Sequence, residues 1–157
     1  MNMKCARLWA IGIGALVGAS LLPMGQGYAG KDDHPTRCTL ATLNGQYLFS
    51  GSGTLFPPAF GVTSVSTATS AGFHIFNGDG TGLEFVTFSV DGIDQHVPSP
   101  VAITYTLNHN CTGTYSVQNG PNFNIFVAVD GSALTIINTD PGIAFSSGPQ
   151  FRVGLDR

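Results

Sequence analysis

A histidine and a glutamate, His74 and Glu84, lie on either side of a glycine-rich turn. If residues 77–81 form a five-residue loop, the two side chains stand opposite one another across a β-hairpin. A histidine–carboxylate pair on an apolar wall can act as general acid and base toward a bound ligand, so we predict His74 and Glu84 as catalytic residues. A four-residue loop would pair His74 with Leu83 instead and dissolve this arrangement. The alternative to a catalytic pair is a structural or solvent-exposed pair.

The same hairpin carries apolar side chains that suit a binding cavity. Because strand residues alternate between two faces, the apolar residues at even positions of this hairpin share the face of His74. Ligand cavities are mainly apolar and contain few polar groups. The predicted ligand-binding residues are Phe76, Val86, Phe88 and, from a later strand, Tyr105.

The turn itself, Asn77-Gly78-Asp79-Gly80-Thr81, has oxygen-bearing side chains at alternate positions, as at the start of a calcium loop. The distal glutamate that completes such a loop is missing, because Glu84 comes too early. Asparagine and aspartate followed by glycine are also what a tight hairpin turn requires. We therefore predict a turn here, no metal site and no cofactor.

The N-terminal residues 1–29 have the pattern of a secretory signal peptide. Lys4 and Arg7 precede an uncharged apolar run at 8–22, and small residues flank Tyr28 before the predicted cleavage after Ala29. A transmembrane anchor is the alternative, but this run is shorter than the ~20 residues that a spanning helix needs. We predict a secreted or periplasmic protein with a polar tail at 30–37.

The charge balance of the mature chain excludes one class of partner. Removing 29 of the 157 residues leaves 128, which carry four Lys or Arg residues and nine Asp or Glu residues. Binding to a phosphate backbone needs several clustered cations. We therefore predict that the protein does not bind nucleic acid.

Two cysteines remain after the predicted cleavage, Cys38 and Cys111. An even number of cysteines in an exported chain predicts a disulfide, which would hold the N-terminal segment against a mid-chain turn. In the chain-entropy model, closing a loop of this length contributes about 4 kcal/mol. A two-cysteine metal site is the alternative, but partners at ligand spacing are missing.

Short apolar runs separated by turn dipeptides fill residues 38–157, and this pattern is typical of an all-β domain. Residues 101–107 alternate most regularly, residues 61–70 suit a loop or a weak edge strand, and Ser147-Gly148-Pro149 suits a turn. Short links favour strands that pair with their predecessors. We predict a single antiparallel meander that closes into a roughly eight-stranded β-barrel, with an open sandwich as the alternative.

One predicted strand, residues 83–88, is apolar on both faces. In a barrel, one face fills the interior, and an interior of eight strands holds side chains or one small ligand. The other face needs a cover, for which the N-terminal segment, a partner subunit and lipid are the candidates.

Three stretches resemble a group of small exported bacterial β-barrel proteins of unknown function: CTLATLNGQY at 38–47, FNGDGTG at 76–82 and YTLNHNCTGTY at 105–115. The barrels of that group look like those of allene oxide cyclases and dirigent proteins. The resemblance implies a barrel that takes a hydrophobic small molecule and a homo-oligomer such as a trimer. No catalytic residue of those families matches a position here.

The sequence favours a secreted or periplasmic barrel that binds an apolar small molecule in its interior. A cofactor-free cyclase or isomerase on the same barrel, with His74 and Glu84 as its catalytic residues, is one alternative. A small outer-membrane β-barrel is the other, since low charge and two-faced apolar strands suit it.

Overall fold

The computed structural model describes residues 37–154. Within these residues the chain forms nine strands, which are separated by turns and loops. The predicted signal peptide and the tail up to residue 36 lie outside the described residues. The strands are β1 (Asn44–Leu55), β2 (Ser66–Asn77), β3 (Thr81–Val90), β4 (Ile93–Asp94), β5 (Val101–Tyr105), β6 (Thr112–Val117), β7 (Asn122–Val127), β8 (Ala133–Asn138) and β9 (Ile143–Val153). Two short 3-10 helices, η1 (Leu40–Thr42) and η2 (Ala59–Gly61), flank β1.

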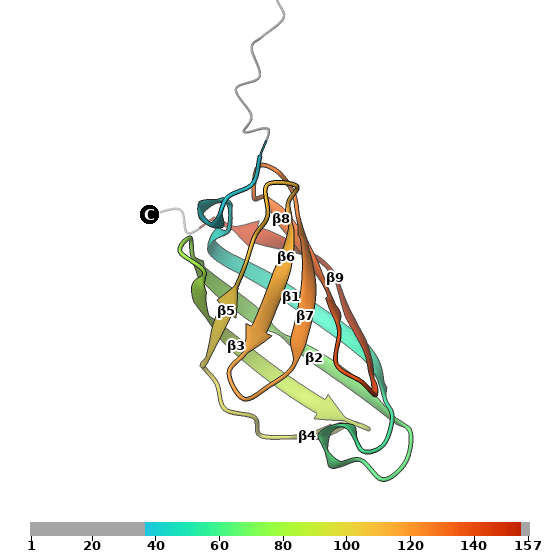
Figure 1. Cartoon of the computed structure of the whole chain (residues 1–157). Helices are drawn as coiled ribbons and strands as arrows, with labels where there is room; N and C mark the ends of the chain where they lie inside the picture. The colour runs from blue at the N-terminus through green and yellow to red at the C-terminus, as the bar shows by residue number, and fades with distance from the viewer. Residues whose placement is uncertain (1–36, 155–157) are drawn as a thin grey trace, which may run out of the picture. The chain divides into compact units, whose positions relative to one another are not determined.

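Eight of these strands close into an antiparallel barrel (Figure 1). Each strand pairs with the one before it, β3 pairs with β5, and β9 returns to pair with β1. The short β4 pairs only with β3 and lies outside the closed ring. The predicted meander and its closure into a barrel of eight strands are therefore confirmed, and the open sandwich is excluded.

Two local predictions were wrong. Residues 66–70, expected in a loop or weak edge strand, begin the 12-residue strand β2, because small inward residues let β2 pair along its whole length with β1. Ser147-Gly148-Pro149 forms no turn but lies within β9. The pairing shifts there by one residue relative to both neighbouring strands, and such a bulge accommodates a proline inside a sheet.

One end of the barrel is filled by side chains. We call it the packed end; it comprises residues 38–43, the turns 78–80, 106–111 and 128–132, and the strand ends beside them. Its core contains Leu43, Tyr47, Phe76, Tyr105 and Ile125, each at most 5% exposed. The Tyr105 hydroxyl donates to the carbonyl oxygens of Leu40 and Leu43, each at 3.0 Å, and so holds η1 over the barrel.

The predicted disulfide closes the packed end. Cys38 and Cys111 are bonded to each other across 73 positions of sequence. The Cys38 amide also donates to the carbonyl oxygen of His109 at 3.2 Å. Residues 38–43 are thereby attached to the turn between β5 and β6, as the sequence predicted.

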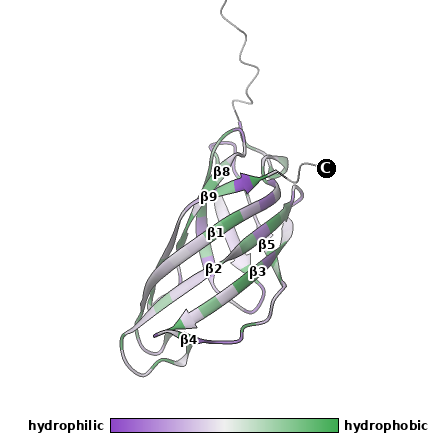
Figure 2. Cartoon of the chain, turned by 180° about the vertical axis from the view of Figure 1, so that it is seen from behind, coloured by the Kyte–Doolittle hydropathy of each residue, from purple (hydrophilic) through white to green (hydrophobic). Residues whose placement is uncertain are grey.

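The outer face carries an apolar row in cross-strand register. Phe151 pairs with Leu48, Leu48 with Phe73, and Phe73 with Phe85, so the row crosses β9, β1, β2 and β3. Figure 2 shows the side of the barrel on which β1, β2 and β3 lie in front, coloured by hydropathy. The Phe73 and Phe85 rings stack at 4.5 Å, whereas Leu48 and Phe151 are 52% and 61% exposed. These strands therefore carry apolar residues on the outer face as well, as the sequence predicted for residues 83–88. The homo-oligomer stays a prediction.

Candidate functional site

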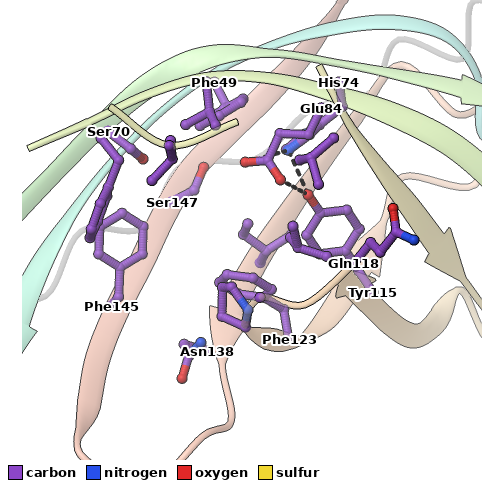
Figure 3. Close-up of a pocket in the computed structure, with 18 of the residues that line it drawn as sticks. Phe49, Ser70, His74, Glu84, Tyr115, Gln118, Phe123, Asn138, Phe145 and Ser147 are labelled. Carbon is purple, nitrogen blue, oxygen red and sulfur yellow. Dashed lines mark hydrogen bonds and ion pairs between the residues drawn. The ribbon is translucent and has the colours of Figure 1, made fainter. Parts of the chain in front are cut away.

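The end of the barrel opposite the disulfide contains a cavity of about 390 Å³ (Figure 3). We call this the hollow end; it comprises the loops 56–65, 91–100, 118–121 and 139–142 and the strand ends beside them. Its walls are largely apolar and include Leu55, Phe60, Val86, Phe88 and Phe145. The hydroxyl of Ser99 accepts from the Val86 amide at 3.2 Å, which holds the loop before β5 beside the cavity.

The floor of the cavity contains the predicted histidine–glutamate pair. His74 on β2 is the direct cross-strand partner of Glu84 on β3, so the five-residue loop is the correct one. The carboxylate of Asp79 shapes this loop by accepting from the amide and hydroxyl of Thr81, at 2.9 and 2.6 Å. Both side chains of the pair point into the barrel, and their residues are 1% and 9% exposed.

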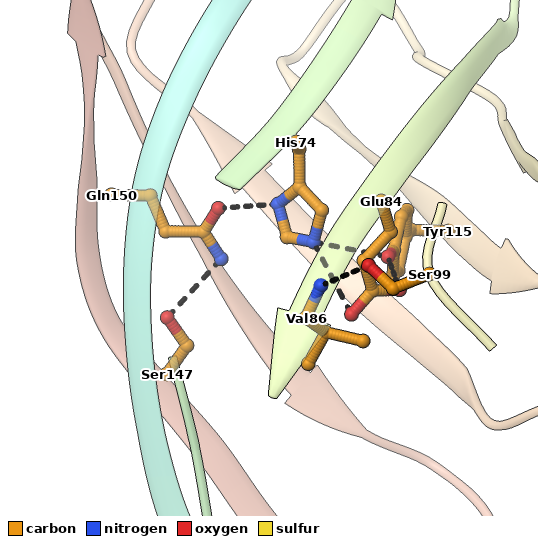
Figure 4. A network of polar contacts seen from close by, with 7 residues as sticks. All are labelled: His74, Glu84, Val86, Ser99, Tyr115, Ser147 and Gln150. Atoms are coloured by element: carbon orange, nitrogen blue, oxygen red, sulfur yellow. Dashed lines mark hydrogen bonds and ion pairs between the residues drawn. The ribbon is translucent and has the colours of Figure 1, made fainter. Parts of the chain in front are cut away.

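A tyrosine from the far side of the barrel joins the two residues. The hydroxyl of Tyr115, on β6, donates to Oε2 of Glu84 at 2.6 Å and lies 3.1 Å from Nε2 of His74 (Figure 4). The direct distance between Nε2 of His74 and Oε1 of Glu84 is 3.8 Å, which is too long for a hydrogen bond. Tyr115 therefore bridges the pair.

The other nitrogen of the histidine is held from β9. Nδ1 of His74 lies 2.8 Å from Oε1 of Gln150, and the Gln150 amide nitrogen donates to the hydroxyl of Ser147 at 3.1 Å. The ring of Phe49 stacks on the imidazole at 4.3 Å. We call His74, Glu84, Tyr115 and Gln150 the polar layer, because these residues separate the hollow end from the packed end.

The protonation of Tyr115 follows from this environment. Burial raises its pKa well above the ordinary value of 10, and the neighbouring Glu84 carboxylate raises it further. A buried phenolate next to a carboxylate would be costly, since neither charge could be solvated. Tyr115 therefore keeps its proton across the physiological pH range and acts as a hydroxyl group.

The four predicted ligand-binding residues divide between the two ends. Val86 and Phe88 line the cavity. Phe76 and Tyr105 lie in the packed core, where their rings meet edge to face at 5.1 Å, and neither lines the cavity. Phe76 and Tyr105 lie where β2 and β5 reach the packed end. The inward orientation of a side chain therefore did not show whether it lines the cavity or belongs to the packed core. We do not retain Phe76 and Tyr105 as ligand-binding residues.

Sequence reasoning missed Tyr115 and Gln150. Tyr115 is a buried residue of β6. Its contact with β2 and β3 crosses the barrel interior, and no local pattern reports such a contact. Gln150 was hidden because the preceding Ser147-Gly148-Pro149 suggested a turn, whereas the bulge directs this side chain inward, where it is 0% exposed.

Within residues 37–154, no three His, Cys, Asp or Glu side chains cluster closely enough to hold a metal ion. The same part of the chain contains no helix long and apolar enough to cross a membrane.

Comparisons of the chain with protein-family models, with curated proteins and with solved structures gave no match. The likeness to allene oxide cyclase and dirigent barrels therefore rests on the three sequence stretches alone.

Proposed function

We propose that the barrel binds a neutral, largely apolar small molecule in its hollow end, with a polar group of the ligand directed toward Glu84. The observation that carries this proposal is the cavity of about 390 Å³, which falls within the range of known ligand sites. Its apolar walls supply most of the contact area, and the polar layer at its floor supplies orientation.

The charges around the cavity favour a neutral ligand. Among the lining residues, all of which lie in the described part of the chain, none is a lysine or arginine. A carboxylate ligand would lose its hydration without meeting a lysine or arginine, and it would lie near Glu84. Alcohols, ketones and similar compounds avoid both costs.

The distribution of side chains favours this function over a membrane-spanning barrel. Such barrels place apolar residues outside and polar residues inside. Over residues 122–125 of β7 the order is reversed, since Asn122 and Asn124 face outward and are exposed, whereas Phe123 and Ile125 are buried inside. The disulfide is compatible with a location outside the cytoplasm, and the signal peptide and export stay predictions.

The test uses the neutral fluorophore N-phenyl-1-naphthylamine with the mature chain. We expect one molecule to bind per barrel. Val86→Phe should abolish binding by filling the cavity, whereas Thr87→Phe, at an exposed neighbouring position, should preserve it. Equal binding by the two variants, or no binding by the unaltered protein, would contradict the proposal.

A cofactor-free isomerase is the second function that we propose, because Glu84 contacts both the cavity and Tyr115. In the isomerisation of cyclohex-3-enone, Glu84 would take a proton from the carbon between the carbonyl and the double bond. It would return that proton to the far alkene carbon as the double bond moves into conjugation. Ultraviolet absorbance follows the product, and Glu84→Gln should reduce the rate to background; an unchanged rate would exclude this function.

A further inference from the structure

The polar layer forms an unbroken line of hydrogen-bonding groups across the barrel. The distances from Gln150 to His74, from His74 to Tyr115 and from Tyr115 to Glu84 are 2.8, 3.1 and 2.6 Å (Figure 4). His74, Tyr115 and Gln150 are each at most 2% exposed, and Glu84 is 9% exposed where it borders the cavity. The hydrogens must therefore be assigned from the members themselves.

The assignment begins at Gln150. Its amide nitrogen donates to Ser147, whose hydroxyl in turn donates to the carbonyl oxygen of Gly148 at 2.9 Å. The amide oxygen of Gln150 is therefore the atom that faces His74, and it can only accept. Nδ1 of His74 consequently carries a hydrogen in every arrangement of the layer.

Tyr115 has one hydroxyl hydrogen and two partners, which leaves two arrangements that satisfy every group. In the first, imidazolium Nε2 donates to the Tyr115 oxygen, and Tyr115 donates to the Glu84 carboxylate. In the second, protonated Glu84 donates to the Tyr115 oxygen, and Tyr115 donates to neutral Nε2. The two arrangements have the same atoms and the same net charge, and they differ only by a concerted shift of two hydrogens along the line.

The remaining protonation states leave a contact unsatisfied. When His74 is neutral and Glu84 is ionised, Nε2 of His74 and the Tyr115 oxygen each direct a lone pair at the other. When His74 is an imidazolium and Glu84 is protonated, both groups donate to the Tyr115 hydroxyl, whose own hydrogen then has no acceptor. Unsatisfied buried groups are costly, so the two fully bonded arrangements are favoured over both alternatives.

We propose that His74, Tyr115 and Glu84 form a proton relay in which Glu84 presents either a carboxylate or a carboxylic acid to the ligand in the cavity. This inference rests on the proposed binding function and specifies its ligand class: neutral molecules whose polar group is either a hydrogen-bond donor, such as an alcohol, or solely an acceptor, such as a ketone. Tyr115, which also borders the cavity, passes the proton between His74 and Glu84 and so sets which form of Glu84 faces the ligand.

The matched probes 2-decalol and 2-decalone test the relay by calorimetry. The unaltered protein should bind both. In Tyr115→Phe no hydroxyl links His74 to Glu84, and Nε2 of His74 lies 3.8 Å from Oε1 of Glu84, so Glu84 cannot take up the relayed proton and donate it to a ketone. The Kd of the ketone should therefore rise about tenfold or more, while that of the alcohol changes within about threefold. Tyr105→Phe, which removes a buried hydroxyl from the packed end, should leave the ratio of the two Kd values unchanged.

The outcomes separate the relay from the binding function. If neither probe binds the unaltered protein, the proposed binding function fails. If both probes bind and Tyr115→Phe changes both Kd values by the same factor or leaves both unchanged, the relay is overturned while binding stands.

A measurement without ligand tests the relay independently. In protein labelled with ¹⁵N at histidine, the His74 Nε2 resonance should move to the unprotonated position in Glu84→Gln, because glutamine can neither supply the mobile proton nor stabilise it on His74. Circular dichroism confirms that the variant is folded. An Nε2 resonance that is at the protonated position in the unaltered protein and stays there in Glu84→Gln would overturn the relay.

Discussion

The two ends of the barrel are built by the same strands but differ in the size of their inward side chains. On β1, Tyr47 points into the packed end, whereas Gly51 and Gly53 follow toward the hollow end. On β2, Phe76 lies in the packed end, whereas Ala68 and Ser70 lie toward the hollow end. Of these small residues, Ser70 lines the cavity, whereas the ring of Phe145 occupies the space beside Gly51. The packed and the hollow end therefore arise within one strand topology.

The comparison also shows where stability and binding are located. At the packed end, Arg152 donates to the Tyr47 hydroxyl at 3.1 Å and to the carbonyl oxygen of Thr42 at 3.0 Å, so even the polar groups serve to close the barrel. At the hollow end, wall residues face empty space and lose contacts that a filled core would make. We expect substitutions at the packed end to affect folding and those at the hollow end to affect ligands.

The largest expected effect comes from breaking the disulfide at the packed end. Replacing Cys38 and Cys111 together by serine should lower the free energy of unfolding by about 4 kcal/mol, because the unfolded chain regains the entropy of a long closed loop. Urea denaturation measures the loss, and reductant should have no further effect on the double variant. A loss below about 1 kcal/mol would show that η1 and its hydrogen bonds close this end without the disulfide.

Two phenylalanines give a direct contrast between the ends. Phe76→Ala should cost about 3 kcal/mol, since the ring is 1% exposed and packs edge to face against Tyr47 and Tyr105. Phe88→Ala should cost about 1 kcal/mol, because the cavity already borders its ring, but it should weaken binding of N-phenyl-1-naphthylamine. Equal losses of stability in urea denaturation would remove the distinction between the two ends.

Alkaline pH should weaken the packed end and the polar layer together. Burial raises the pKa of Tyr47, Tyr105 and Tyr115 above the ordinary value of 10, so the unfolded chain releases these protons at lower pH than the folded chain. Stability is therefore complete below pH 10 and decreases above it, by roughly 1.4 kcal/mol per pH unit for Tyr115 alone. Phenolate absorbance should appear together with loss of the circular dichroism signal; phenolate formation in the folded protein would contradict this prediction.

The smallest effect concerns ligand charge at the hollow end. Decanol should bind about tenfold more tightly than decanoate, because the described lining residues include no lysine or arginine and do include Glu84. Gln118→Lys places a cation at the cavity wall and should improve decanoate binding, whereas Asn124→Lys, on the outer face of β7, should not. Displacement of the fluorophore measures both affinities, and equal binding of the two ligands by the unaltered protein would argue against selection by charge.

Much of the site could be predicted because it depends on local pattern. The loop length between two alternating strands determined that His74 opposes Glu84, and the structure confirms this register. The same alternation correctly predicted that Val86 and Phe88 point inward. It could not separate them from Phe76 and Tyr105, because alternation specifies the face of a strand but not the height within the barrel.

Tyr115 and Gln150 show the limit of such reasoning. Tyr115 lies 31 positions from Glu84, and Gln150 lies 76 positions from His74. Their contacts depend on how far each strand is displaced along its neighbours around a closed ring, and each bulge changes that displacement. The shift in β9 at residues 147–150 is one such change, and it brings Gln150 to the histidine.

The sequence by itself predicted most of the strands, their antiparallel order, the disulfide and, for a five-residue loop, the histidine–glutamate pair. It could do so because turn chemistry and alternation act over short distances and the number of cysteines is read directly from the sequence. The tertiary structure decided that the barrel has a packed and a hollow end, and that a tyrosine bridges the pair at their boundary. These features arise only when the sheet closes, since closure alone brings the inward faces of strands distant in sequence against one another.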